Sequence, residues 1–365
     1  MSAADPLHAF LRACAHLRLS DAGQARLREA ATRVEDWSEL TWLAEEHGLA
    51  PLVRQHVKAC GVVLPERTQH QLTAMAIRHR DASRAHAVAL LDIVDTLDAA
   101  RVPHVILKGA VLAFDVYPRP ELRPRKDIDL LVHPADGSRA VDALRAAGFA
   151  DTNEPVPTGS HHHLPALQRE RDGYRVAVEV HVDAISHDQP DSLTLTALSE
   201  TPRLVTIEGR EVRAFGHLDM LRHLTCHLLE PGARTRLVNV VDVIEYAACH
   251  AGAIDWARLT REQPRTVNTI ALLDYLVPLP EPLQTLRAPA GIAAPEGVGQ
   301  GFPLLSTVRF GRGQRLEALR ALLYPSEWWM RAYYGVPAGR ALAPVRWTRH
   351  VWRLAHWGLR RTAGA

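Results

Sequence analysis

The chain has 365 residues, of which 47% are hydrophobic and 23% charged, a composition typical of a globular protein. This length allows two or three domains. The formal net charge is only +2, so the molecule as a whole lacks the strong positive charge typical of a nucleic-acid-binding protein. No apolar run reaches membrane-spanning length, no signal peptide is evident, and four widely spaced cysteines favour reduced thiols. These features predict a cytoplasmic protein.

The first 98 residues are predicted to be helical. Leu40, Leu43 and Ala44 recur at helical spacing before His47-Gly48 ends the segment. A second, longer helical pattern covers residues 67–99. We therefore expect a helical N-terminal region over residues 1–98.

The period changes after residue 98 and predicts a small α/β core over residues 99–215. Short helices are expected at 110–117 and 135–147, separated by a loop rich in proline and arginine. Another polar loop is expected over 151–165. Strands are predicted at 102–108, 127–132 and 174–182.

Residues 216–365 return to helical patterns and are expected to form a C-terminal helical domain. Helices are predicted at 217–230, 236–250 and 254–262. The segment 264–303 is rich in proline and glycine and gives no clear pattern, whereas the tail 308–362 is helical in parts and rich in Arg and Trp. The fold class is therefore α+β, a small mixed sheet flanked by helical regions.

Two carboxylates mark the candidate site. Asp127 and Asp129 are two residues apart on a predicted strand, so their side chains share one face. Adjacent carboxylates repel unless a cation lies between them, and Mg²⁺ or Mn²⁺ accepts such oxygen ligands. Upstream, the turn Lys108-Gly109-Ala110 offers backbone that a phosphate can approach closely.

A second acidic face is predicted about fifty residues later. Glu179, His181 and Asp183 alternate with a row of valines, so the polar side chains share one face. Three carboxylates on neighbouring strands, Asp127, Asp129 and Glu179, could hold two divalent cations. The basic residues near the first pair are candidate phosphate contacts: Lys108, Arg123, Arg125 and Lys126.

These residues resemble a known group. The segments ILKGAVLAFDVYP, RPRKDIDLLV, VEVHVDAI and VVDVIEYAACHAGAIDWARL are similar to those of a bacterial nucleotidyltransferase group within the polymerase-β-type superfamily. The resemblance extends from about Trp37 to the tail. It implies metal-binding carboxylates at Asp127 and Asp129, with Glu179 as the third, and a phosphate-binding turn at Lys108 and Gly109. The superfamily's usual turn is Gly-Ser or Gly-Gly, and here it lacks the Ser hydroxyl.

Several further polar residues have two interpretations each. One histidine of the tract 161–163, with His163 the candidate, could reach the active site, as could His181. Asp242, one helical turn before Glu245, could face the acceptor or form a structural salt bridge. His223, Cys226 and His227 could bind zinc or lie in a helical core.

The tail also has two interpretations. Trp347, Val351 and Leu354 follow helical spacing among many arginines, as in a helix that contacts an acidic membrane or RNA. Alternatively, the tail packs its tryptophans on the body of the protein.

The hypothesis is transfer of a nucleoside monophosphate from a nucleoside triphosphate to an acceptor hydroxyl or phosphate. Pyrophosphate would be released, and Mg²⁺ or Mn²⁺ would be the cofactor. The acceptor could be a small molecule, a peptide or protein, or RNA. Two alternatives remain: metal-dependent sugar transfer from a nucleotide sugar to a peptide or glycan, and a catalytically inactive core that serves as a binding scaffold.

Overall fold

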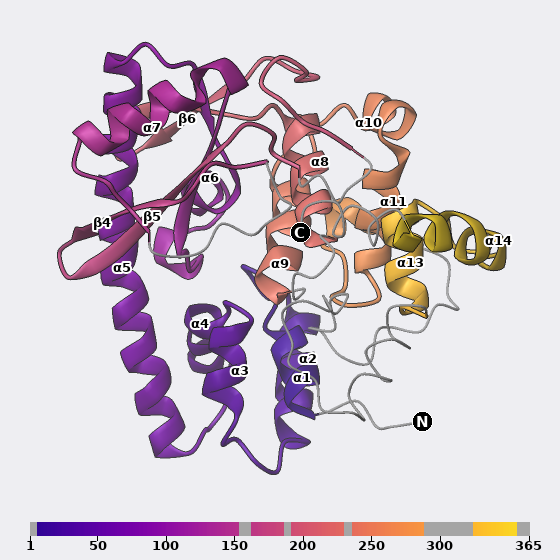
Figure 1. Ribbon diagram of the computed structural model, residues 1–365. Helices are drawn as coiled ribbons and strands as arrows, with labels where there is room; N and C mark the ends of the chain where they lie inside the picture. The colour runs from indigo at the N-terminus through magenta and orange to yellow at the C-terminus, as the bar shows by residue number, and fades with distance from the viewer. Residues whose placement is uncertain (1–5, 153–161, 186–190, 230–235, 288–323, 356–365) are drawn as a thin grey trace.

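The computed structural model describes residues 6–152, 162–185, 191–229, 236–287 and 324–355. None of the helices in these ranges is both long enough and apolar enough to cross a membrane. Figure 1 shows a sheet with covering helices beside a group of C-terminal helices, above the N-terminal helices.

The N-terminal region is helical, as predicted. It consists of α1 (Pro6–Ala13), α2 (Asp21–Thr32), α3 (Leu40–Glu46), α4 (Ala50–Cys60) and α5 (Glu66–Ala99). The Ser20 hydroxyl accepts a hydrogen bond from the Gly23 amide and so caps α2. The 34-residue α5 runs the height of the molecule beside the sheet (Figure 1), and its last turns pack Ile93, Val94 and Leu97 into the core of the sheet.

The sheet is mixed and has seven strands in the order β3-β4-β5-β2-β1-β7-β6. β2 pairs in parallel with β5 and antiparallel with β1. The strands predicted near 102–108, 127–132 and 174–182 are present, but the sequence patterns missed four short ones. The strands are β1 (His104–Ile106), β2 (Asp127–Val132), β3 (Ala150–Asp151), β4 (Leu167–Arg171), β5 (Tyr174–His181), β6 (Arg203–Ile207) and β7 (Arg210–Ala214).

The two faces of the sheet are covered differently. Apolar side chains of β2 and β5, such as Ile128 and Val178, pack with α5 and α7 (Gly137–Ala146) in one core cluster. The opposite face carries Asp127 and Asp129, together with Leu131, which joins the core of the C-terminal helices. The short helix α6 (Lys108–Asp115) follows β1 and packs beside β2. The polar face of the two central strands therefore looks toward the helical side of the molecule.

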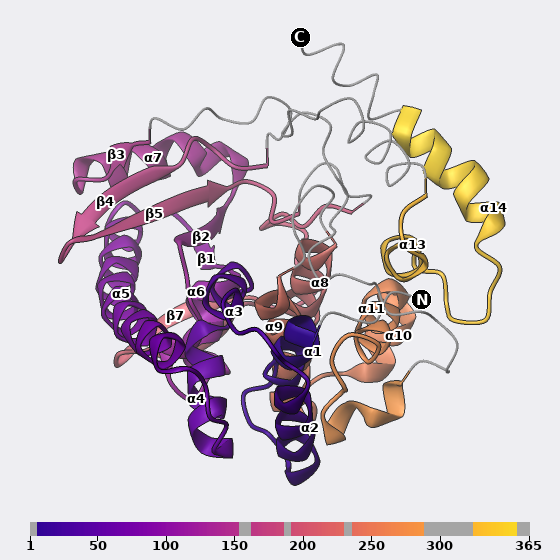
Figure 2. The ribbon, with the colours of Figure 1, turned by 90° about the horizontal axis from the view of Figure 1, so that it is seen from below.

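The C-terminal helices form the second large core. They include α8 (His217–Leu228), α9 (Leu237–Cys249) and α10 (Trp256–Glu262), close to their predicted positions. The helix α11 (Pro264–Leu273) was not predicted. Seen from below, α8 and α9 stand between the sheet and the outer helices α11 and α13 (Glu327–Tyr334) (Figure 2). The predicted domain boundaries at residues 98 and 215 stay predictions.

The tail is helical over α14 (Ala343–Val345), a π-helical turn at Arg346–His350, and residues 351–355. Trp347 and Trp352 are 62% and 67% exposed. Neither side chain is buried, although the Trp347 ring contacts that of Tyr324, so both interpretations of the tail stay predictions. Trp357 lies outside the described residues.

Candidate active site

The turn between β1 and α6 brings a lysine to the acidic strand. The Leu107 amide donates to the Asp129 carbonyl at 2.9 Å, which joins the turn to β2. Lys108 has a φ of +28°, a backbone conformation that disfavours a residue with a side chain. In this conformation the Lys108 ammonium Nζ lies 3.2 Å from Asp129 Oδ2. The turn therefore tolerates local strain while Lys108 pairs with the central carboxylate.

Parallel pairing of β2 and β5 aligns the second acidic strand. Asp129 lies directly beside Glu179, and Asp127 lies beside Ala177. His181 Nε2 is 3.0 Å from Asp129 Oδ1 and 3.5 Å from Glu179 Oε2. The strand pairing thus brings Asp127, Asp129, Glu179 and His181 to one face, as their spacing predicts. We call these four residues and Lys108 the site cluster.

The site cluster has an excess of negative charge. The charge of Asp129, assisted by burial, raises the pKa of Asp127 to about 6. Burial of Asp129 itself favours the protonated acid, but Lys108 and His181 outweigh it and hold the pKa of Asp129 far below its ordinary value. Burial likewise opposes protonation of His181, yet its hydrogen bonds to Asp129 and Glu179 raise its pKa. The charge of Asp129 is therefore well neutralised, whereas the charge of Asp127 is not.

The donor set fits a divalent cation. Ligand atoms of Asp129, Glu179 and His181 lie within 4.8 Å of one another. Asp127 lies outside that group but shares its strand face with Asp129. Carboxylate oxygens suit Mg²⁺ or Mn²⁺, and the repulsion on Asp127 is what a bound cation would relieve. Because His181 already contacts two carboxylates, its placement suits orienting them.

Arg123 and Asp242 form a different, closed cluster. Arg123 Nη2 donates to Asp242 Oδ2 at 2.6 Å, and the Tyr117 hydroxyl donates to Asp242 Oδ1 at 2.7 Å. We call these three residues the scaffold cluster. Asp242 is 2% exposed, so the structural salt bridge is the interpretation that the geometry supports, and the acceptor-side role is not favoured. The same pairing directs the Arg123 guanidinium, a predicted phosphate contact, into the protein.

Gly109 has a role that the sequence patterns missed. A Cβ at this position would lie 2.7 Å from Arg123 Nη1 and 2.8 Å from Arg123 Cζ. The bare backbone predicted to admit a phosphate is therefore approached by the Arg123 guanidinium. This contact packs the phosphate-binding turn against the scaffold cluster.

The remaining predicted phosphate contacts divide into two groups. Arg125 donates to the Ser83 hydroxyl at 3.0 Å and lies over the Phe114 ring, and burial lowers its pKa to about 9. The side chain of Ala110 is buried in the core of the sheet. Lys126, by contrast, is exposed, and Lys108 belongs to the site cluster. The two lysines therefore remain the better placed cations.

Two histidines of the tract 161–163 lie close to the site cluster. His163 forms a β-bridge with His181, and their ring centroids are 5.4 Å apart. The ring of His162 lies 5.5 Å from that of His181. The predicted approach of this tract is therefore present at His162 and His163, whereas His161 lies outside the described residues.

The sequence predicts that His223 on α8 is either a zinc ligand or a core residue. It is 2% exposed, and neither ring nitrogen has a hydrogen-bond partner among the described residues. Burial drives its pKa well below the ordinary value, and the charges of Lys108, Asp129 and His181 act on it. Cys226 instead lies 3.9 Å from Asp191, so it does not converge with His223 on a zinc site.

Comparison with known proteins identifies the family. A family model described as an uncharacterised nucleotidyltransferase matches residues 33–274, about two thirds of the chain. The chain belongs to this family. The resemblance inferred from the LKG turn and the DIDLLV strand is thereby confirmed, and generic nucleotidyl transfer is the activity class. No curated protein matches this nucleotidyltransferase.

Solved structures are only distantly similar. An antigenic nucleotidyltransferase-like protein from Paracoccidioides brasiliensis is 17% identical with a TM-score of 0.33, covering 50% of this chain and 89% of its own. The lincomycin-bound lincosamide antibiotic adenylyltransferase LnuA is 12% identical with a TM-score of 0.26, covering 36% and 82%. The antibiotic-resistance factor ANT(2'')-Ia is 14% identical with a TM-score of 0.30, covering 48% and 91%.

Proposed function

We propose that this nucleotidyltransferase transfers a nucleoside monophosphate from a nucleoside triphosphate to an acceptor hydroxyl or phosphate, with Mg²⁺ or Mn²⁺ as cofactor. The observation that carries the proposal is the register of β2 and β5, because it sets Asp129 beside Glu179 with Asp127 on the same face. Lys108 and His181 neutralise only part of this charge. The cluster therefore favours binding of a cation that also contacts phosphates.

Each residue of the site cluster has a chemical role in this proposal. Asp127, Asp129 and Glu179 would hold the divalent cation, which supplies charge stabilisation for the triphosphate and the leaving pyrophosphate. Lys108 would bind a phosphate oxygen, assisted by amides in the first turn of α6, which no side chain caps. His181 would keep Asp129 and Glu179 correctly oriented.

The reaction forms a bond between the acceptor oxygen and the α-phosphorus. The bond from that phosphorus to the oxygen bridging to the β-phosphate breaks, and pyrophosphate leaves. The proton of an acceptor hydroxyl would pass to Glu179, whose side chain is 29% exposed and so open to an acceptor. Lys108 would stabilise the charge that develops on the phosphates.

Calorimetry tests the proposal directly. ATP, GTP, CTP and UTP are each titrated with Mg²⁺ into the wild type and into Asp127→Asn/Asp129→Asn. We expect one triphosphate to bind in a Mg²⁺-dependent manner, and the variant to weaken binding by at least about 100-fold. Even an outer partner of a metal ligand contributes about 10- to 100-fold to metal affinity.

A matched control separates the site from general charge. Asp142→Asn/Asp172→Asn removes two carboxylates that are 73% and 76% exposed, and it should bind as the wild type does. Equal binding by all three proteins would contradict the proposal. If every triphosphate fails and a nucleotide sugar binds, the sugar-transfer alternative replaces it. If none of these nucleotides binds to the folded protein, the alternative of a catalytically inactive scaffold replaces the proposal.

A further inference from the structure

A cavity lies on the other side of α8 from the site cluster. It has a volume of about 780 Å³, within the range of small-molecule sites. It lies between α11, α13 and the tail helix. Its lining, as far as the described residues form it, includes three arginines, Arg265, Arg349 and Arg353, and one carboxylate, Asp191. The catalytic carboxylates are not part of this lining.

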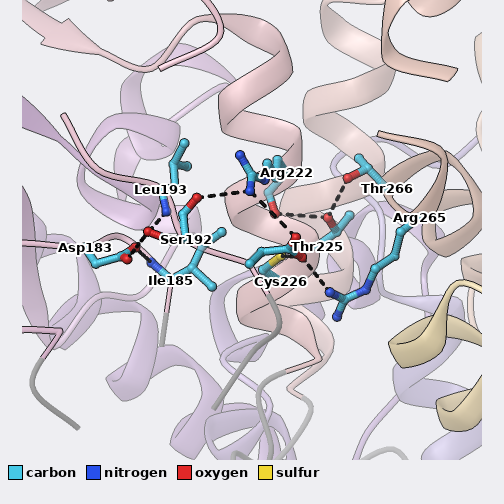
Figure 3. Close-up of polar contacts among 10 residues, drawn as sticks. Asp183, Ile185, Ser192, Leu193, Arg222, Thr225, Cys226, Arg265 and Thr266 are labelled. Atoms are coloured by element: carbon cyan, nitrogen blue, oxygen red, sulfur yellow. Dashed lines mark hydrogen bonds and ion pairs between the residues drawn. The ribbon is translucent and has the colours of Figure 1, made fainter. Parts of the chain in front are cut away.

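The helix α8 separates the two sites. Its residue His223 experiences the charges of Lys108 and Asp129, whereas Arg222 and Cys226 lie 3.7 Å and 3.9 Å from Asp191. Figure 3 shows Arg222 and Cys226 of α8 near Arg265 of α11, beside the segment with Ser192 and Leu193. The cavity is therefore distinct from the catalytic site.

The cavity has an excess of positive charge. Arg265 pairs with Asp191 at 2.7 Å, which accounts for the only carboxylate among the described lining residues. Arg349 and Arg353 lie over the rings of Tyr334 and Tyr333, with 5.8 and 4.8 Å from each guanidinium carbon to the ring centroid. Within the described part of the chain, neither arginine has a carboxylate partner. Guanidinium groups held in one cavity favour an anion, above all a phosphate, because each planar guanidinium can donate to two oxygens of this tetrahedral group.

Aromatic surface accompanies this charge. The indole of Trp352 lines the cavity and is 67% exposed, and Tyr334 is partly buried beside it. Exposed tryptophan next to arginine is the combination on which nucleic-acid bases stack while the phosphate is neutralised. Isolated phosphate would use only the arginines, so the aromatic lining points to a ligand that also carries a planar ring.

We propose that this cavity binds a nucleotide unit, with its phosphate on Arg349 and Arg353 and its base on Trp352. The unit is either a free nucleotide or the terminal nucleotide of a single-stranded RNA, because both present the same chemistry. Binding needs no divalent cation, since arginines rather than carboxylates form the lining. The cavity would then deliver or sense a nucleotide apart from the triphosphate site.

The cavity is also joined to the catalytic strand. Asp183, two residues after His181, accepts hydrogen bonds from the Ile185 amide at 2.9 Å and the Leu193 amide at 2.8 Å (Figure 3). The Asp183 carboxylate also accepts a bond from the Ser192 hydroxyl, and Ser192 is adjacent to Asp191. Hydrogen bonds therefore link Asp183, just after β5, to the short segment that contains Asp191, and Asp191 pairs with Arg265.

Calorimetry in the presence of EDTA tests the cavity alone. AMP and a short single-stranded oligoribonucleotide are titrated into the full chain, into Arg349→Gln/Arg353→Gln and into Arg340→Gln/Arg346→Gln. The last variant removes the same charge from the same tail but leaves the cavity intact. We expect the first variant to weaken binding at least about tenfold, because two charge-assisted hydrogen bonds are lost, and the control to bind as the wild type does.

The two probes identify the source of the nucleotide. Binding of AMP with this pattern assigns a free nucleotide, and binding of the oligoribonucleotide alone assigns an RNA end. Equal weakening in both variants, or no binding of either probe, would overturn the proposal. If Arg349→Gln/Arg353→Gln does not fold, Trp352→Ala tests the base contact. Asp127→Asn/Asp129→Asn should retain this binding, which separates failure of the cavity from failure of the catalytic proposal.

Discussion

The scaffold cluster and the site cluster both place carboxylates beside cationic groups, but they differ in how completely the negative charge is compensated. In the scaffold cluster one carboxylate, Asp242, accepts hydrogen bonds from Arg123 and Tyr117, so its charge is fully compensated. In the site cluster three carboxylates share one lysine and one histidine. A buried carboxylate with balanced charge therefore holds elements together, whereas a group with uncompensated negative charge favours binding of a cationic ligand.

Removing Asp242 should have the largest effect on folding. Asp242→Ala leaves the Arg123 guanidinium buried without its partner, and breaking a buried pair in this way costs about 3–5 kcal/mol of the free energy of unfolding. Denaturation by urea measures this change. Asp142→Ala, at an exposed ion pair, should cost less than about 1 kcal/mol. Equal losses for the two variants would show that the scaffold cluster does not join α9 to the turn before β2.

Gly109 lies where the two clusters meet. A substitution at this position tests whether the turn is packed against the Arg123 guanidinium. Gly109→Ala places a methyl group against a guanidinium that Asp242 holds in position, so the free energy of unfolding should fall by about 1–3 kcal/mol. Gly252→Ala is the control, because a Cβ there would have open space. If the stability of the two variants is the same, Arg123 moves freely and the turn is not packed against the scaffold cluster.

The site cluster was predictable from sequence because its pattern is local. Alternating valines set the face of Glu179 and His181, and two-residue spacing set the face of Asp127 and Asp129. Their convergence required only that β2 and β5 be neighbours, which they are.

The scaffold cluster was not predictable in the same way. Arg123 finds its partner 119 residues later, and a pairing at that distance leaves no periodic signal. For the same reason the approach of His223 to the site cluster followed only from the packing of α8. The missed helix α11 did carry a local signal, since Pro264 is its first residue, where proline is favoured. The proline-rich surroundings masked this signal.

Removing a carboxylate from the site cluster should raise the free energy of unfolding, whereas removing Asp242 from the scaffold cluster lowers it. In metal-free protein at pH 7.5, Asp127→Asn should raise the free energy of unfolding by about 1–2 kcal/mol, because it removes a charge that Asp129 repels. The pKa of Asp127 is raised to about 6, so between pH 4 and pH 6 the folded state holds a proton that the unfolded state has lost. The advantage of the variant should therefore be absent near pH 4, grow as the pH rises from 4 to 6, and be fully present above pH 6.

Added Mg²⁺ should reverse the order of stability at pH 7.5, since the wild type binds the cation in its folded state and the variant has lost a ligand. Urea denaturation at pH 4 and at pH 7.5, each with EDTA or with Mg²⁺, measures the free energy of unfolding in all four conditions. A variant that is less stable than the wild type in EDTA would mean that Asp127 is as well compensated as Asp242, and the distinction between the two clusters would fail. A gain that Mg²⁺ does not reverse would instead locate the cation away from Asp127.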